Sequence, residues 1–220
     1  MKSRPEPTTT AFAILGMIAI RPMSPYELAG WFDRSLGRLW PRARSKLFEG
    51  PKNLVTLGYA KATRERSGPR RKTVYSITPA GRRALAAWLE KPGTPPEIEF
   101  EQLLKIFFAE HGSKRAVITN LEAAADWAYG QIEHNIAVGK SYLSGQGPFQ
   151  DRAPQVYLSG MFLGEFSLLI DAWSRWALGV VRTWPNDTSS ATPDTAAIAA
   201  LCKRLERRLK DLQRLREEPA

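Results

Sequence analysis

Two short stretches of this chain are rich in residues that can bind a polyanion. One is residues 42–52, and the other is the triplet of cations at residues 70–72, which follows a Ser-Gly-Pro turn. Lysine and arginine bind phosphate through charge and hydrogen bonds, and an aromatic ring can pack on a thymine methyl. The candidate residues are Arg42, Arg44, Ser45, Lys46, Phe48, Lys52, Arg70, Arg71 and Lys72. These residue types would bind a charged partner and would not catalyse a reaction.

The sequence holds no motif for catalysis, a metal or a cofactor. It has no P-loop, no dinucleotide glycine fingerprint and no Gly-x-Ser-x-Gly. His111 and His134 are far apart, and neither has a cysteine or second histidine at metal-ligand spacing. We therefore expect a protein that is not an enzyme and binds no cofactor.

The positive charge is confined to the first part of the chain. Residues 1–91 hold 18 Lys/Arg against 6 Asp/Glu, whereas residues 92–220 hold 14 against 16. This asymmetry indicates a polyanionic partner for the first part and a different task for the second. The alternative is a basic domain that is merely soluble.

Cysteine usage and hydropathy favour a cytoplasmic protein without a membrane partner. Cys202 is the only cysteine, so no intrachain disulfide can form. The longest apolar run, residues 11–20, is shorter than the roughly 20 residues that a spanning helix needs. Because Arg21-Pro22 follows it without a signal-peptide cleavage site, we expect a buried helix.

The first ninety residues predict three helices followed by a β-hairpin and a fourth helix. Capping residues start the first helix near residue 8 and the second at Ser24-Pro25, where Glu27 completes a capping box. The third helix should begin near Ser45, end at Gly58, and kink or restart at Gly50-Pro51.

The hairpin should consist of strands at residues 59–66 and 73–78, with residues 67–72 as its turn. Thr78 and Pro79 then start the fourth helix. The fold class is therefore mainly α with a small two-stranded wing, in winged helix-turn-helix order.

Residues 12–90 resemble the N-terminal domain of the PadR family of transcriptional regulators. The resemblance rests on residues 14–18, Tyr26-Glu27-Leu28, the block 45–58, and the Pro-Arg-Arg-Lys-x-x-Tyr-x-Ile-Thr-x-x-Gly-Arg pattern of residues 69–82, which is the most specific. Ser24-Pro25 replaces the family's usual His-Gly, and Gly50-Pro51 departs from its more continuous third helix.

The winged-helix order predicts a role for each candidate residue. The third helix enters the major groove, so Ser45, Lys46 and Phe48 lie nearest the base edges. The remaining cations contact phosphate: Arg42, Arg44, Lys52, Arg70, Arg71 and Lys72. Three alternatives stay open: Phe48 belongs to the core, Ser45 only caps its helix, and the basic turn is a solvated hairpin tip.

The second half should form a separate helical domain. Pro92 and Pro95-Pro96 mark a linker, which divides the chain into domains at residues 1–91 and 92–220. Helical periodicity covers residues 97–109, 113–139, 154–181 and about 193–217. This half resembles, more weakly, the helical dimerisation domain of longer PadR-like proteins.

The last helix carries an apolar seam at alternating spacings of four and three. Its members are Ile198, Cys202, Leu205, Leu209 and Leu212. Such a seam packs on a partner helix and predicts a homodimer, with an intramolecular bundle face as the alternative. On the seam, Cys202 should be buried and inert.

The resemblance also implies a small aromatic effector, because family members often sense such molecules. Trp127, Trp173 and Trp176 could line its pocket, although tryptophans at helical spacing are also typical of a core. We therefore expect a cytoplasmic homodimeric repressor that binds an inverted-repeat operator in duplex DNA. The alternatives are a helical adaptor whose basic domain binds an acidic surface, and a ligand sensor.

Overall fold

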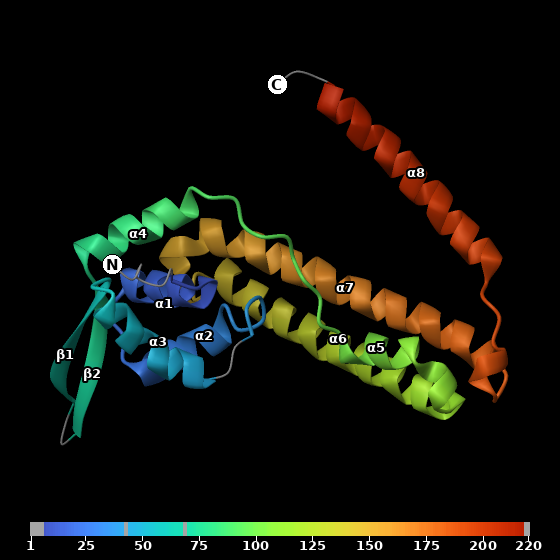
Figure 1. The fold of residues 1–220 in the computed structure, drawn as a ribbon, viewed down its shortest axis with the longest axis horizontal. Helices are drawn as coiled ribbons and strands as arrows, with labels where there is room; N and C mark the ends of the chain where they lie inside the picture. Colours follow the sequence, from blue (N-terminus) through green and yellow to red (C-terminus); the bar gives the residue numbers. More distant parts are fainter. Residues whose placement is uncertain (1–6, 42–43, 68–69, 218–220) are drawn as a thin grey trace, which may run out of the picture. The chain divides into compact units, whose positions relative to one another are not determined.

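The chain divides into two compact units, residues 1–97 and 98–220. The computed structural model describes residues 7–41, 44–67 and 70–217, and Figure 1 shows its ribbon. The division lies a few residues beyond the predicted boundary at 91, in a stretch without regular structure. We call the two parts unit 1 and unit 2.

Unit 1 has the predicted winged-helix order. The Thr8 hydroxyl accepts a hydrogen bond from the Ala11 N–H at 3.2 Å and caps the first helix. The Ser24–Glu27 capping box starts the second helix, as predicted. The elements are α1 (Thr9–Ile20), α2 (Pro25–Arg34), α3 (Arg44–Thr56), β1 (Ala60–Ser67), β2 (Arg70–Ile77) and α4 (Pro79–Leu89).

The core of unit 1 is closed around α1. That helix is apolar on most sides, so it contacts α2, α3, α4 and β2. Phe12 of α1 stacks on Trp88 of α4, with ring centroids 5.0 Å apart. Side chains that are fully buried come from all three early helices: Ile14, Leu15, Ile18, Leu28, Phe32, Leu47 and Leu54.

The prediction for α3 was a kink or a restart at Gly50-Pro51, and the helix runs unbroken through Pro51, so the restart is wrong and the kink stays a prediction. A proline inside a helix costs about 3 kcal/mol because it removes one backbone hydrogen bond. The Pro51 ring is buried in the core, and its burial offsets part of that cost. Gly50 permits close packing against α1, since a Cβ there would lie 2.2 Å from Cδ1 of Ile14.

The hairpin differs from its prediction in length. Strand β2 begins at Arg70, so Arg70, Arg71 and Lys72 lie on the strand and not in the turn as predicted. The residues between the strands, Gly68 and Pro69, are outside the described part. A short bridge adds to the sheet, because Met23 and Tyr75 exchange backbone hydrogen bonds of 3.0 and 2.8 Å.

Two glycines join the hairpin to the helices on either side of it. Gly58 ends α3 with φ of +76°, as predicted for a left-handed stop. At the start of α4, a Cβ on Gly81 would lie 2.1 Å from the carbonyl oxygen of Tyr59. Only glycine therefore permits this approach, which fixes the wing between α3 and α4.

Unit 2 is built on a long antiparallel pair of helices, α6 (Lys114–Leu143) and α7 (Ala153–Thr183), which lie side by side in Figure 1. The other elements are α5 (Glu101–Phe107), α8 (Thr195–Glu217) and the short 3₁₀ turns η1 (Ala109–His111), η2 (Gln150–Arg152) and η3 (Thr188–Ser190). Helix α5 is shorter than the predicted residues 97–109, whereas α6 and α7 are slightly longer than predicted.

The core of unit 2 gathers at one end of the α6–α7 pair. Lys114 donates to the carbonyl oxygens of Arg182 and Trp184, at 2.8 and 2.6 Å, and so caps the end of α7. The buried cluster consists of Ala109, Val117, Leu121, Ala177, Leu178 and Val181. Large apolar side chains remain exposed elsewhere, including Leu104 and Phe107 of α5 and Phe162 of α7.

Helices α7 and α8 leave much apolar surface uncovered. By length and composition alone the segment Gln150–Thr183 could cross a membrane, with 11% of its most apolar window buried. Its pairing with α6 and the hydrogen bonds of Ser167 and Asn135 are those of a helical bundle. No residue of α8 is buried among the described residues.

Candidate nucleic-acid interface

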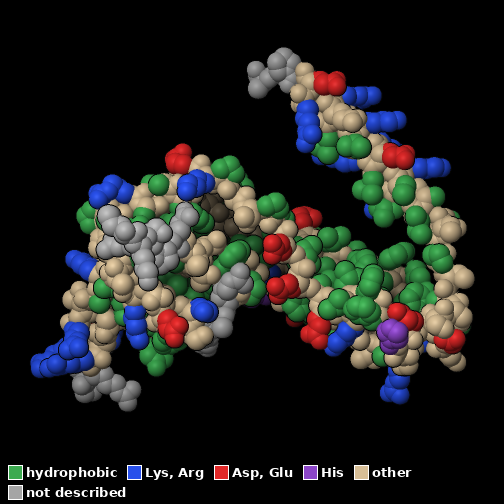
Figure 2. All heavy atoms as spheres, viewed as in Figure 1, with side chains coloured by type: hydrophobic (Ala, Val, Ile, Leu, Met, Phe, Trp, Pro, Cys, Tyr) green, Lys and Arg blue, Asp and Glu red, His purple; other side chains and the backbone are tan. Residues whose placement is uncertain are grey.

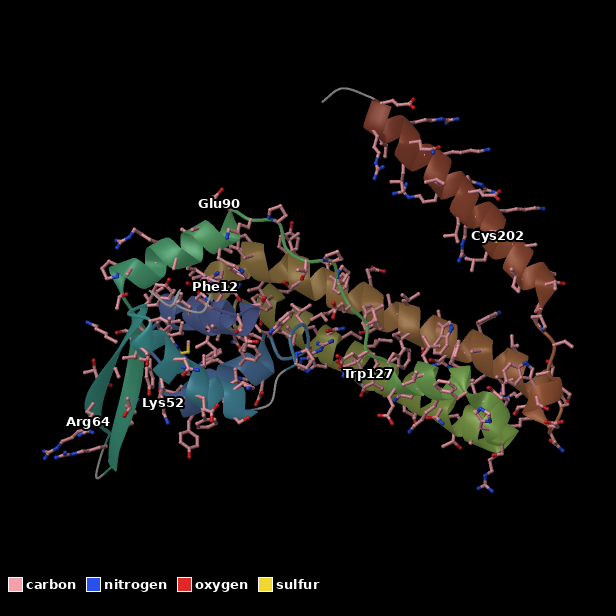
Figure 3. The ribbon with its side chains drawn as sticks, viewed as in Figure 1. Phe12, Lys52, Arg64, Glu90, Trp127 and Cys202 are labelled. Carbon is pink, nitrogen blue, oxygen red and sulfur yellow. The ribbon has the colours of Figure 1, made fainter. Side chains whose placement is uncertain are left out.

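The beginning of α3 presents polar side chains outward and apolar ones inward. Leu47 and Leu54 are buried, whereas Ser45, Lys46 and Lys52 are exposed. Ser45, Phe48 and Lys52 follow one another at helical spacing, so they share one side of the helix. Figure 3 labels Lys52 on this helix.

Phe48 is half-buried and forms an aromatic pair with Tyr26. The rings meet edge to face at 85°, with centroids 5.1 Å apart. Tyr26, in the first turn of α2, is 80% exposed. Phe48 is therefore neither a fully buried core residue nor an isolated surface ring, because it is held against an exposed tyrosine.

The wing carries three arginines on one face. In the hairpin register Arg66 lies opposite Arg71, and Arg64 lies opposite Thr73. Directly opposed residues of an antiparallel pair point to the same face, and so do residues two apart. Arg64, Arg66 and Arg71 therefore share one face and are all exposed, and Figure 3 shows Arg64 extending from the strand.

Like charges opposite each other destabilise a hairpin. The Arg66–Arg71 pair therefore costs stability when the wing is free, and a bound polyanion would relieve that cost. Figure 2 shows basic side chains gathered on the wing. Arg64 and Arg66 were missed by the sequence reasoning, although their period-two spacing in Arg-Glu-Arg could have revealed them.

Lys72 lies on the opposite wing face and contacts α2. Its Nζ is 3.3 Å from Oε1 of Glu27, while the Ser24 N–H and hydroxyl donate to Oε2 at 2.8 and 2.7 Å. The hydrogen bonds from the Ser24 hydroxyl and backbone, followed by Lys72, lower the pKa of Glu27 from 4.5 to about 2. Lys72 thus connects the wing to the capping box of α2.

Three of the predicted contact residues are outside what the structure describes. Arg42 lies in the undescribed stretch 42–43, and the side chains of Arg44 and Arg70 are also undescribed. Their predicted contacts with phosphate stay predictions. Of the nine candidates, the structure brings Phe48 to α2 through Tyr26 and Lys72 to α2 through Glu27.

Unit 2 places the three candidate tryptophans in different surroundings. Trp127 of α6, labelled in Figure 3, lines a hollow of about 230 Å³ together with Phe100, Phe166 and Ile170. Trp173 contacts Phe100 edge to face at 5.6 Å and packs on the core cluster. Trp176 is 56% exposed and is not among the residues that line the hollow.

The predicted seam of α8 is exposed along its whole length. Its members Ile198, Leu205, Leu209 and Leu212 are between 41% and 58% exposed. Cys202 is an exposed free thiol, so the prediction of a buried cysteine is wrong for the single chain. Within residues 7–41, 44–67 and 70–217, no group of three or more His, Cys, Asp or Glu could hold a metal.

No protein-family model matches the chain, but curated proteins do. The chain is 28% identical over 99 residues to the negative transcriptional regulator PadR of Bacillus subtilis. The aligned region covers 44% of this chain and 54% of the relative. The chain is also 33% identical over 84 residues to a probable transcriptional regulator of Mycobacterium tuberculosis, covering 38% and 44%. The chain spans about half the length of these curated relatives. Both relatives are regulators, which supports the prediction that this chain is not an enzyme.

Solved structures share the fold over most of the chain. Bacillus subtilis PadR in complex with operator DNA matches with a TM-score of 0.66 at 20% identity, covering 79% of this chain and 99% of that one. A PadR-like regulator of Bacillus cereus matches with a TM-score of 0.65 at 13% identity, covering 79% and 98%. The winged-helix prediction is thereby confirmed. In sequence the chain is therefore similar to two transcriptional regulators, one of them a PadR protein, and in fold it is similar to PadR and PadR-like regulators.

Proposed function

We propose that this chain is a transcriptional regulator that binds duplex DNA through unit 1. The observation that carries the proposal is the arrangement of two exposed basic elements on one small domain. The start of α3 presents Ser45 and Lys46, and one wing face presents three arginines. A structure of Bacillus subtilis PadR with operator DNA, which has the same fold, supports this use of the domain.

The two elements divide the work of recognition. Lys46 on α3 contacts guanine acceptors in the major groove, and Phe48 with Tyr26 forms an apolar surface for a thymine methyl. The wing arginines neutralise phosphate, which gives affinity without sequence preference. Arg42, Arg44, Lys52 and Arg70 add further backbone contacts.

Unit 2 supports dimerisation. Residues 98–194 hold 11 Asp/Glu against 7 Lys/Arg, whereas α8 holds 7 Lys/Arg against 3 Asp/Glu. The exposed seam of α8 is thus both apolar and basic, and the exposed apolar faces of α5 to α7 lie on an acidic body (Figure 2). Helix α8 of one copy packs on these helices of a second copy, because two α8 helices alone would repel each other.

A dimer places two winged helices on one DNA molecule. Two copies related by twofold symmetry bind two half-sites, so the operator is an inverted repeat. The regulator acts as a repressor in the cytoplasm. Among similar proteins Bacillus subtilis PadR is a negative regulator, while a Vibrio cholerae virulence activator shares the fold with a TM-score of 0.56.

Selection of bound sites from random duplex DNA tests the proposal. We expect an inverted repeat to be enriched, and an affinity that falls steeply as salt rises. Equal affinity for all duplexes, or an affinity that ignores salt, would contradict it and favour an adaptor whose basic domain binds a protein. A reporter gene placed behind the selected site then distinguishes repression from activation.

The hollow beside Trp127 supports a second role, the binding of a small aromatic effector. It lies within unit 2 and is lined by three aromatic rings. A structure of Bacillus subtilis PadR in complex with p-coumaric acid shares the fold, with a TM-score of 0.61 at 20% identity and coverage of 80% of this chain and 99% of that one. An effector bound in unit 2 would change the affinity of unit 1 for DNA.

A further inference from the structure

The charge of the hollow beside Trp127 restricts the ligand that it can accept. Its walls consist of Ile98, Glu99, Phe100, Gln102, Ala124, Trp127, Phe166 and Ile170. Among these lining residues there is one carboxylate and one amide, but no lysine, arginine or histidine. A ligand there would meet aromatic side chains and one carboxylate.

The aromatic rings come from three separate elements. Phe100 precedes α5, Trp127 lies on α6 and Phe166 lies on α7. Each is held by another ring: Phe100 contacts Trp173 at 5.6 Å, and Trp127 contacts Phe166 edge to face at 6.2 Å. The face of an aromatic ring is partly negative and attracts cations, and groups of aromatic side chains around one site bind quaternary ammonium compounds.

Glu99 adds a formal negative charge that is free to pair. In the described part of the chain it has no hydrogen-bond or ion-pair partner. The nearest lysine along the chain, Lys105, is paired with Glu101 at 2.8 Å. An aromatic acid would place its own carboxylate beside Glu99 without a lining cation to balance it, which opposes binding.

We infer that this hollow binds a small organic cation, an aromatic or quaternary ammonium compound, and not an aromatic acid. The inference rests on the proposed role of unit 2 as an effector domain but names a different ligand class from the p-coumaric acid bound by Bacillus subtilis PadR. The cation sits against Phe100, Trp127 and Phe166, and its charge is balanced by Glu99.

Calorimetry with three probes of similar size tests this inference on the full-length protein. The probes are phenyltrimethylammonium, its uncharged isostere tert-butylbenzene, and p-coumarate. We expect the cation to bind about tenfold more tightly than the isostere, and p-coumarate to bind most weakly. Tighter binding of p-coumarate than of the cation would overturn the inference.

Two variants locate the site. Glu99→Gln should weaken the cation about tenfold and leave the isostere unchanged, and Trp127→Leu should weaken both. Glu110→Gln, which changes an exposed carboxylate outside the hollow, should have no effect. An affinity for the cation that is unchanged in both Glu99→Gln and Trp127→Leu would also overturn the inference. DNA affinity measured without any probe tests the proposed function separately, so the two can fail independently.

Discussion

Unit 1 and unit 2 differ in how completely each buries its own apolar residues. Within the described residues, Tyr26, Val55 and Leu89 are the large exposed hydrophobics of unit 1, whereas unit 2 exposes many along α5 to α8. Unit 1 closes its core with caps, a sheet bridge and close glycine contacts. Unit 1 therefore covers its own apolar core, whereas the exposed apolar side chains of unit 2 are what the proposed dimer would cover.

The largest expected effect comes from the seam of α8. In the proposed dimer, Leu205→Asp removes an apolar contact in each copy and places a charge in the interface. Burying one leucine contributes about 1.5–3 kcal/mol, and each of the two copies loses one such contact. The dissociation constant of the dimer should therefore rise by about 100-fold or more. Analytical ultracentrifugation measures the change, and Gln213→Asp on the same helix serves as the control. A dimer that persists unchanged in Leu205→Asp would show that unit 2 is covered in another way.

The same change should spare unit 1. Its circular dichroism and thermal unfolding are expected to persist, while the affinity for an inverted repeat falls towards that for a half-site. The single thiol of Cys202 gives an independent measurement. It should react slowly with a maleimide in the dimer and quickly in Leu205→Asp.

Two glycine substitutions test whether unit 1 is packed more tightly than unit 2. Gly81→Ala places a methyl group against the Tyr59 carbonyl and should destabilise unit 1 by about 1–3 kcal/mol. Gly130→Ala, in the middle of α6 with open space around it, should stabilise unit 2 by about 0.5–1 kcal/mol. Urea unfolding measures both. A destabilising Gly130→Ala would show that a second copy packs against α6 at this point.

Within unit 1, α3 and the wing should differ in what they recognise. Lys46→Ala should lower specific affinity by about 1–3 kcal/mol and relax the sequence preference. Arg71→Ala should weaken binding evenly for specific and random duplexes and reduce the salt slope by about one unit. Fluorescence anisotropy at several salt concentrations compares them. If both variants lost specific and random binding equally, the assignment of base contacts to α3 and phosphate contacts to the wing would be wrong.

Lys72 should behave unlike Arg71 because it is paired with Glu27. Lys72→Gln removes the ion pair of Glu27, although the hydrogen bonds from Ser24 remain, and it should weaken DNA binding a few-fold, by about 0.5–1 kcal/mol. Glu27→Gln in the same chain should restore most of that loss, and glutamine still fits the capping box. If the double variant binds DNA as weakly as Lys72→Gln, then Lys72 contacts phosphate directly.

The smallest expected effect is the response of stability to acid. The pKa of Glu27 is lowered from 4.5 to about 2 in the fold. A group with a lowered pKa stabilises the fold above its unfolded value and loses that contribution as pH falls through its folded value. Between pH 4.5 and 2 the wild type should lose stability that Glu27→Gln does not lose. Parallel acid titrations followed by circular dichroism would reveal the difference.

Local signals in the sequence predicted much of the first domain. Ser24, Glu27, Thr78 and Gly58 act through hydrogen bonds and backbone angles within a few residues, so their roles can be read from spacing. The start of α3 and the order of its neighbours followed from the same reasoning. These predictions are confirmed because each depends on short-range chemistry.

The features that the sequence predicted wrongly depend on contacts between residues that are distant in the chain. The unbroken α3 requires the core around Pro51 and Ile14, and the basic triplet lies on β2 because the hairpin register extends to Arg70. The pairing of Lys72 with Glu27 joins positions 45 residues apart. Neither spacing nor composition could reveal which of the wing cations is already paired.

The sequence by itself determined the winged-helix order, the separation of charge between the two parts, and the apolar seam of α8, because periodicity and composition encode them directly. Only the tertiary structure decided which residues of the two wing strands lie opposite each other, which tryptophan lines a hollow, and that the α8 seam stays exposed in one chain. The physical reason is that burial and pairing arise only when folding brings distant residues together. Strand register and helix packing depend on several segments at once, so no single segment determines them.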